Sequence, residues 1–176
     1  MVETPEYNVI KQIGEIEIRH YPLIFLATAT GQGGDDLFGA LFRYISGDNS
    51  GNQKIAMTAP VITPEKIAMT APVISDSGSM SFIVPSKYTR ETVPKPLDSR
   101  ISIIEVPART MAVLRFSGWG DAKTVAEKKG KLLEILTENN IRPKGEIVLM
   151  RYNSPWTPWF VRRNEVAVEI ETEDIK

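Results

Sequence analysis

The feature that most constrains the fold is a sequence pattern that occurs once in each half of the chain. Ile-x-Ile-x-x-x-Pro begins at Ile16 and again at Ile101, and each copy is followed by an apolar run and then by Gly31 or Gly118. Both halves also show the same expected order of elements: strand, strand, helix, strand, strand. We therefore predict a duplicated unit, with pseudo-repeats at about residues 7–84 and 100–171.

The expected elements define the fold class. In the first half we predict two extended runs within residues 7–31, a helix from Asp35 and Asp36 to about Ile45, and strands at 55–62, 67–74 and 79–84. The second half is expected to hold strands at 101–106, 111–116, 146–152 and 165–171 and a helix over 122–138 capped by Asp121. Two helices packed on such strands predict an α+β fold, a distorted and largely antiparallel β-barrel with two helices.

Length and composition limit the classes of function. The chain has 176 residues, which suits a single domain over residues 1–176, and it has no cysteine for disulfides, thiolate catalysis or iron–sulfur clusters. Its 21 Lys and Arg balance 22 Asp and Glu, so we expect no nucleic-acid partner. The longest apolar stretch, residues 23–27, is too short to cross a bilayer. We predict a cytoplasmic protein without membrane insertion.

A nine-residue sequence, KIAMTAPVI, occurs in tandem at residues 54–62 and 66–74. We expect Thr63, Pro64 and Glu65 to turn the chain so that the two copies pair as a hairpin. Pro60 and Pro72 favour an edge position, because a central strand needs their missing amide donors. The alternative is that one copy is a local duplication that loops out.

The first helix carries more apolar surface than packing on a sheet requires. Its apolar residues cover roughly 160° of the helix circumference, whereas about 100° suffices. Arg43 is the charged residue among them. Either a loop covers the excess, or it forms a ligand groove or a partner surface. The apolar residues are Leu37, Phe38, Leu41, Phe42, Tyr44 and Ile45.

Aromatic residues and prolines are concentrated at residues 152–160, followed by two arginines. Trp156 and Trp159 could cover a planar ligand, and Arg162 could pair with its carboxylates. The alternative is a proline-stiffened plug over the end of a barrel, in which both tryptophans are buried.

Candidate metal ligands and catalytic groups are few. His20 is the only histidine, and its position beside Arg19 predicts a solvated side chain at a strand edge. Met57 and Met69 are expected in the core. Glu165, Glu169 and Glu171 alternate with apolar residues and are interpreted as a solvated strand face, so we assign no catalytic residue and no metal site.

Successive segments resemble the SOUL haem-binding family in matching order, from Tyr7 to Ile170. These segments are EIEIRHYP, LFRYISGDN, KIAMTAPV, SFIVPSKY with PKPLD, FSGW and YNSPWTPWFVRRNEV. The resemblance implies a duplicated unit in a distorted barrel with two helices, related to gyrase-inhibitor-like small-molecule-binding domains. It also implies a tetrapyrrole on apolar residues near the first helix, which here are Phe38, Leu41, Phe42, Arg43 and Ile45.

The sequence thus predicts a non-enzymatic protein that binds haem, another tetrapyrrole or a similar flat hydrophobic small molecule beside the first helix. His20 lies outside the region that would hold the ligand, so axial ligation by histidine is not expected. Two alternatives remain. One is a gyrase-inhibitor-like hydrolase, for which an aromatic cleft with one glutamate would suffice and which a buried glutamate with a raised pKa in that cleft would favour. The other is a protein-interaction module that uses the apolar helix face.

Overall fold

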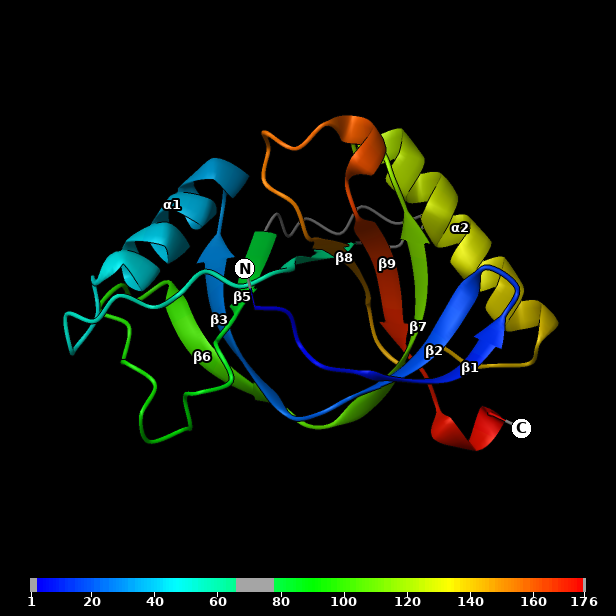
Figure 1. Cartoon of the computed structure of the whole chain (residues 1–176), viewed down its shortest axis with the longest axis horizontal. Coiled ribbons are helices and arrows are strands. Elements are labelled where there is room, and N and C mark those ends of the chain that lie inside the picture. The colour runs from blue at the N-terminus through cyan, green and yellow to red at the C-terminus, as the bar shows by residue number, and fades with distance from the viewer. Residues whose placement is uncertain (1–2, 66–77, 176) are drawn as a thin grey trace. The chain divides into compact units, whose positions relative to one another are not determined.

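The computed structural model describes residues 3–65 and 78–175. It contains antiparallel strands and two α-helices, α1 (Gly34–Ser46) and α2 (Ala122–Glu138), so the α+β class is confirmed. The described chain forms two compact units (Figure 1). One comprises Leu23–Thr63 and Ala68–Pro107 with the N-terminal residues through Pro5. The other comprises Glu6–Pro22, Pro64–Ile67 and Ala108–Lys176.

In the first unit, a four-stranded sheet packs against α1. The strands are β3 (Ile24–Gly31), β4 (Val61–Glu65), β5 (Gly78–Ile83) and β6 (Ile101–Val106), in the order β4-β5-β3-β6. Helix α1 lies on β3 and β5 and buries Leu37, Leu41 and Tyr44 against them. The helix ends at Gly47, where φ is 121°, and the buried Asn49 side chain donates to the Tyr44 carbonyl at 2.9 Å. The expected stop after Ile45 is therefore confirmed.

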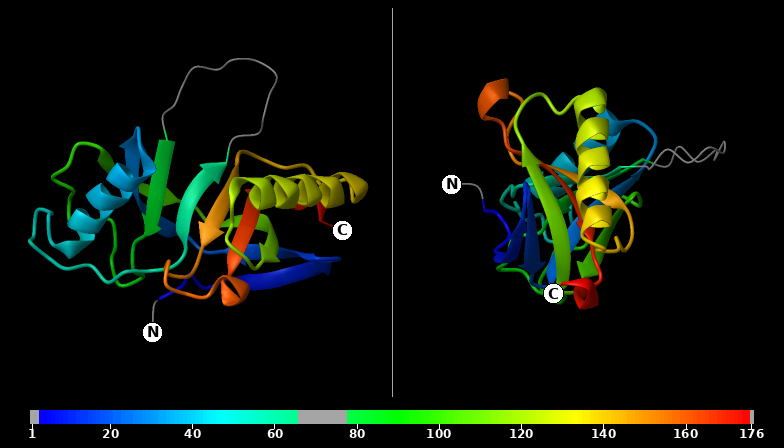
Figure 2. Two further views of the ribbon diagram at one scale, coloured as in Figure 1. Left: turned by 90° about the horizontal axis from the view of Figure 1, so that it is seen from above. Right: turned by 90° about the vertical axis from the view of Figure 1, so that its right-hand side faces the viewer.

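In the second unit, a five-stranded sheet packs against α2 (Figure 2). The strands are β1 (Asn8–Ile13), β2 (Ile16–Tyr21), β7 (Arg109–Phe116), β8 (Ile147–Arg151) and β9 (Asn164–Glu169), in the order β1-β2-β7-β9-β8. Helix α2 begins as expected, because the Asp121 carboxylate accepts a hydrogen bond from the Thr124 amide at 3.0 Å. Val125, Leu132 and Leu136 of α2 are buried against the sheet.

The strands of the two units have equivalent orders and equivalent registers. Each unit takes three strands and a helix from one predicted repeat. The first unit adds β6 from the other repeat, and the second unit adds β1 and β2. Ile16 of β2 lies opposite Leu114, and Ile101 of β6 lies opposite Ala29. The shift from 16 to 101 and the shift from 29 to 114 are the same, 85 residues. Duplication remains a prediction, and this register is what duplication would produce.

The structure corrects the expectation for the tandem KIAMTAPVI sequence. The predicted turn at residues 63–65 is wrong, because these residues lie within β4, which pairs with β5 through Val61 and Ile62. The predicted strand at 55–62 is also wrong, since β4 begins only at Val61. Residues 54–60 precede it, with the Thr58 hydroxyl donating to the Ile83 carbonyl. The second copy lies outside the described residues, so its pairing stays a prediction.

Candidate functional site

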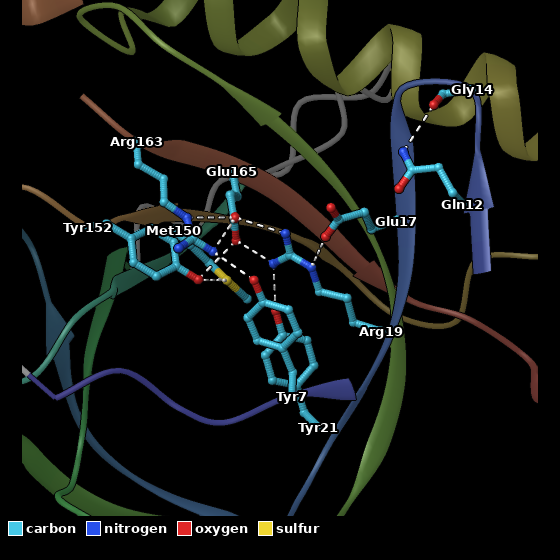
Figure 3. Close-up of polar contacts among 10 residues, drawn as sticks. All are labelled: Tyr7, Gln12, Gly14, Glu17, Arg19, Tyr21, Met150, Tyr152, Arg163 and Glu165. Atoms are coloured by element: carbon cyan, nitrogen blue, oxygen red, sulfur yellow. Dashed lines mark hydrogen bonds and ion pairs between the residues drawn. The ribbon is translucent and has the colours of Figure 1, made fainter. Parts of the chain in front are cut away.

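The second unit contains a buried cluster of charged and phenolic groups on the sheet face opposite α2. Its centre is an ion pair between Arg19 of β2 and Glu165 of β9, with two hydrogen bonds of 2.9 and 3.1 Å (Figure 3). Arg19 is 2% exposed and Glu165 is fully buried. The expectation that Glu165 lies on a solvated strand face is wrong. Ile16 and Ile18 alternate with Arg19 and point instead into the core under α2.

A second arginine binds the same carboxylate. Arg163 donates from Nε and Nη2 to Oε1 of Glu165 at 2.9 and 2.7 Å. The Tyr152 hydroxyl donates to Oε2 at 2.9 Å, and the Arg163 guanidinium lies 4.0 Å from the centre of the Tyr152 ring. Glu165 therefore accepts charge-assisted hydrogen bonds from two cations, the stronger kind of hydrogen bond in proteins.

Arg19 also makes contacts with residues other than Glu165. Its Nε donates to Glu17 at 2.7 Å, and its Nη1 donates to the Tyr21 hydroxyl at 3.0 Å. The guanidinium lies 4.2 Å from the centre of the Tyr7 ring, within range of a cation–π interaction. Figure 3 shows these side chains converging from strands that are far apart in the sequence.

The electrostatics keep the cluster ionised at its carboxylate and neutral at its phenols. Burial raises the pKa of Glu165, but the hydrogen bonds and charges of Arg19 and Arg163 outweigh burial and hold this pKa below its usual value. Burial, aided by the Glu165 charge, raises the pKa of Tyr152. Burial also raises the pKa of Tyr21. Glu165 is thus a paired anion, and it is not the glutamate of raised pKa that would favour the hydrolase alternative.

Sequence reasoning missed this cluster for an identifiable reason. Charged residues that alternate with apolar residues are typical of a half-solvated strand, and Arg19 and Glu165 both follow that pattern. Their pairing depends on the registers of β2 with β7 and of β7 with β9, and 146 residues separate the two partners. No local signal shows which charges face each other across β7.

In the first unit, α1 has an exposed aromatic face. Phe38 and Phe42 are 41% and 50% exposed, and their rings lie nearly parallel, with centroids 6.3 Å apart and planes at 16°. Leu41 and Ile45, which were predicted with them, are buried in the core instead of exposed on this face. Arg43 is 53% exposed, and its guanidinium lies 3.9 Å from the Asp98 carboxylate.

The other predicted ligand residues belong to the second unit. They lie in the loop between β8 and β9, which contains a short 3-10 helix, η1 (Trp159–Val161). Trp156 is 93% exposed and Trp159 is 51% exposed, so the alternative of a plug with both tryptophans buried is wrong. Arg162 lies over the Trp119 ring, 4.6 Å from its centre. A role for these residues in ligand binding stays a prediction.

The candidate axial ligands considered from the sequence are His20, Met57 and Met69. His20 is exposed on β2, where its Nδ1 lies 3.4 Å from the Thr110 hydroxyl. It belongs to the second unit, whereas Phe38 and Phe42 belong to the first. Met57 is 42% exposed, so the expectation that it lies in the core is wrong. Met69 lies outside the described part of the chain.

Comparison with solved structures identifies the general fold. The chain is similar to the C-terminal domain of EcmrR, with a TM-score of 0.67 at 10% identity over 94% of this chain and 98% of that domain. It is also similar to a hydrolase from Listeria innocua, with a TM-score of 0.60 at 10% identity over 92% of this chain and 94% of that protein. At such identity the likeness shows a shared fold alone.

Comparison of sequences identifies the family. The model of the SOUL heme-binding protein family matches residues 2–169, so the chain belongs to this family. Heme-binding protein 2 of Homo sapiens is 29% identical over 188 aligned positions, which cover 97% of this chain and 91% of the human protein. Heme-binding protein 2 of Mus musculus is 27% identical over 181 positions, covering 95% of this chain and 87% of the mouse protein. The resemblance predicted from the sequence motifs is confirmed.

No helix among the described residues is both long enough and apolar enough to span a membrane.

Proposed function

We propose that the protein binds haem or a similar flat tetrapyrrole against the aromatic face of α1, without enzymatic turnover. The observation that carries the proposal is the pair of nearly parallel, half-exposed rings of Phe38 and Phe42, one helical turn apart. Membership of the SOUL heme-binding protein family supports this class of ligand. A planar macrocycle can stack on such rings and remove their apolar surface from water.

The surroundings of the two rings suit a rigid binding face. The ring of Phe38 meets Phe82 of β5 edge to face at a centroid distance of 5.7 Å, which holds it in place. Leu41, on the adjacent part of the helix surface, anchors the helix in the core, so little conformational entropy would be lost on binding. The aromatic face of α1 is thus already formed before the ligand binds.

Arg43 would recognise the carboxylates of the ligand. Its contact with Asp98 is long, at 3.9 Å, and its side chain is half exposed, so the guanidinium can turn toward an added carboxylate. Arginine pairs with carboxylates through two parallel hydrogen bonds. The residues of this face thus fit a macrocycle with acidic side chains, and the bound haem would supply its own redox chemistry. Our assignment includes no axial ligand from His20.

Porphyrin fluorescence titrations test the proposal. Phe42→Ala should weaken protoporphyrin binding about tenfold, because a lost ring contact of ~1.4 kcal/mol corresponds to that factor. Arg43→Gln should weaken binding of protoporphyrin more than binding of its dimethyl ester, which lacks the carboxylates. Leu97→Ala is a matched control, since Leu97 is 64% exposed in the same unit and outside the proposed face. Equal affinity in the parent protein and Phe42→Ala would refute the location.

A further inference from the structure

All three tryptophans of the chain are gathered on one surface of the second unit. Trp119, Trp156 and Trp159 are 62%, 93% and 51% exposed, although tryptophan is usually largely buried. Phe160 and Val161 of η1 are exposed beside them. In Figure 1 the loop with η1, in orange, lies beyond the N-terminal end of β9. We call these five residues the tryptophan surface.

The exposure of these rings is built into the loop. The Gly118 amide donates to the Trp159 carbonyl at 3.0 Å, which ties the end of β7 to η1. Arg162 donates through Nε to the Thr157 carbonyl at 2.7 Å and through Nη2 to the Pro155 carbonyl at 2.5 Å. The backbone is thus fixed from two sides while the side chains point outward.

The sequence segments that contain the tryptophan surface are basic. Residues 109–120 and 151–164, which include its five residues, contain arginines and no acidic residue, although the chain as a whole is nearly neutral. No ion pair among the described residues involves Arg115, Arg151 or Arg162. The next acidic residue, Asp121, accepts hydrogen bonds from the amide and hydroxyl of Thr124 at the start of α2.

Two hollows flank η1 and bring the arginines together with the rings. An open groove of about 610 Å³ is lined by Arg115, Phe116, Ser117, Phe160, Val161 and Arg162. A smaller hollow of about 230 Å³ is lined by Trp119, Arg151, Asn153, Pro155, Arg162 and Asn164. Arg162 lines both, so cationic groups lie directly behind the exposed rings.

We propose that the tryptophan surface docks on the face of an anionic phospholipid bilayer, without crossing it. Indole rings partition to the headgroup layer, where their apolar body and polar N–H are both satisfied. Arg115 would contact lipid phosphates, which arginine binds through paired hydrogen bonds. Arg151 and Arg162 donate hydrogen bonds to loop carbonyls and would attract anionic headgroups through their charge. Aromatic insertion combined with attraction to anionic lipids is the general basis of peripheral membrane binding.

The shape of the surface favours a bilayer over a protein partner. Trp156 stands almost clear of the protein, and a ring that is 93% exposed can enter a soft headgroup layer directly. A protein partner would need a preformed pocket complementary to each protruding ring. This docking does not depend on ligand binding at α1, because the proposed ligand residues Phe38, Phe42 and Arg43 belong to the other unit.

The intrinsic fluorescence of the full chain tests the proposal directly, since every tryptophan lies on the surface in question. Vesicles of phosphatidylcholine mixed with phosphatidylserine should shift tryptophan emission to shorter wavelength and should sediment the protein. Vesicles of phosphatidylcholine alone should bind at least about tenfold more weakly, and added salt should weaken binding to the anionic vesicles. Trp156→Ala with Phe160→Ala should reduce binding about tenfold or more.

Matched controls distinguish vesicle binding through the tryptophan surface from nonspecific vesicle binding and from ligand binding. Leu97→Ala and Arg90→Gln change an exposed apolar residue and an exposed arginine of the other unit, and both variants should bind anionic vesicles like the parent protein. The single variant Phe160→Ala, which changes none of the predicted ligand residues, should weaken vesicle binding and keep its porphyrin affinity. The proposal is overturned by absence of binding to anionic vesicles, by equal binding of the double variant and its parent, or by binding that ignores lipid charge and salt.

Discussion

The Arg19 guanidinium binds the Glu165 carboxylate through two hydrogen bonds, joining β2 to β9 across the intervening strand β7. Neither side chain is more than 2% exposed. Each charge has been removed from water and is stabilised mainly by the other. Glu165 is also stabilised by Arg163, and Arg19 also donates to Glu17. Because the pair is buried, removal of either partner alone should lower the free energy of unfolding substantially.

Removal of the carboxylate should strongly destabilise the fold. Glu165→Ala leaves Arg19 buried without its main counter-charge, and we expect a loss of about 3 to 5 kcal/mol in the free energy of unfolding. Glu169→Gln is the control on the same strand, since Glu169 is 29% exposed and its ion pairs are 3.7 and 3.8 Å long. It should cost under about 1 kcal/mol in urea denaturation. Similar costs for both variants would mean that the buried pair contributes no more than a surface pair.

The same pair should be visible in the pH dependence of stability. The folded-state pKa of Glu165 lies below the unfolded value of about 4.3. Its contribution is therefore present above the unfolded pKa and is lost as the pH falls through the folded pKa. Urea titrations should show stability falling more steeply below about pH 4 in the parent protein than in Glu165→Gln. Parallel curves for the two proteins would contradict the lowered pKa.

Two adjacent residues of α1 should respond differently to truncation. Leu41 is fully buried, so Leu41→Ala should cost about 2 to 5 kcal/mol through lost burial and a cavity. Phe42→Ala should cost under about 2 kcal/mol, because half of the ring is already in water. Phe38→Ala should fall between them, since its ring edge also meets Phe82. Denaturant melts of the three variants provide the comparison, and equal losses would place Phe42 in the core.

The two helices differ in how they begin, and this difference predicts different sensitivities. Asp121→Ala removes the side-chain cap of α2 and should cost about 1 kcal/mol. The N-cap of α1 is Gly33, which has no side-chain cap, so Asp35→Ala removes only a favourable charge near the helix start. That change should cost at most about 0.5 kcal/mol. Urea denaturation of both variants would show whether the cap of α2 matters as its geometry indicates.

Haem binding, where it is observed, should not need His20. This imidazole is exposed on β2, near the Thr110 hydroxyl, in the unit that does not contain the proposed face. Absorption spectra of haem titrated into the parent protein and into His20→Ala should therefore coincide. A low-spin spectrum that disappears in the variant would establish His20 as an axial ligand and overturn our assignment.

The sequence predicted those elements whose signals are local. Helix α2 occupies residues 122–138 as expected. Its N-cap at Asp121 and the spacing of its apolar residues can both be read from one continuous stretch of sequence. The strand expected at 55–62 was wrong because KIAMTAPVI has the composition of a strand, whereas its pairing with β5 begins only at Val61. Local propensity could not show where the partner strand begins.

For the candidate site, the sequence predicted the aromatic excess of α1, with Phe42 at the edge of the apolar arc and Leu41 near its middle. Packing on β3 and β5 buries Leu41 and leaves both phenylalanines half exposed, but Leu41 and Ile45 do not belong to the exposed face with which they were predicted. The Arg19–Glu165 pair could not be predicted from the sequence, because it depends on the register of β2 with β7 and on that of β7 with β9. A charged side chain on a strand is usually solvated, but it can be buried when it pairs with an opposite charge.

The shared strands β2 and β6 determine how the chain could be divided. A fragment of residues 7–84 would contain β2 without β7, its neighbour in the sheet, and β3 without β6 on its other side. Two identical fragments could complete each other, each lending β2 to the sheet of its companion. Such complementation has the symmetry of a closed homodimer, so a half-length chain that folds should be recovered in pairs and not as a monomer.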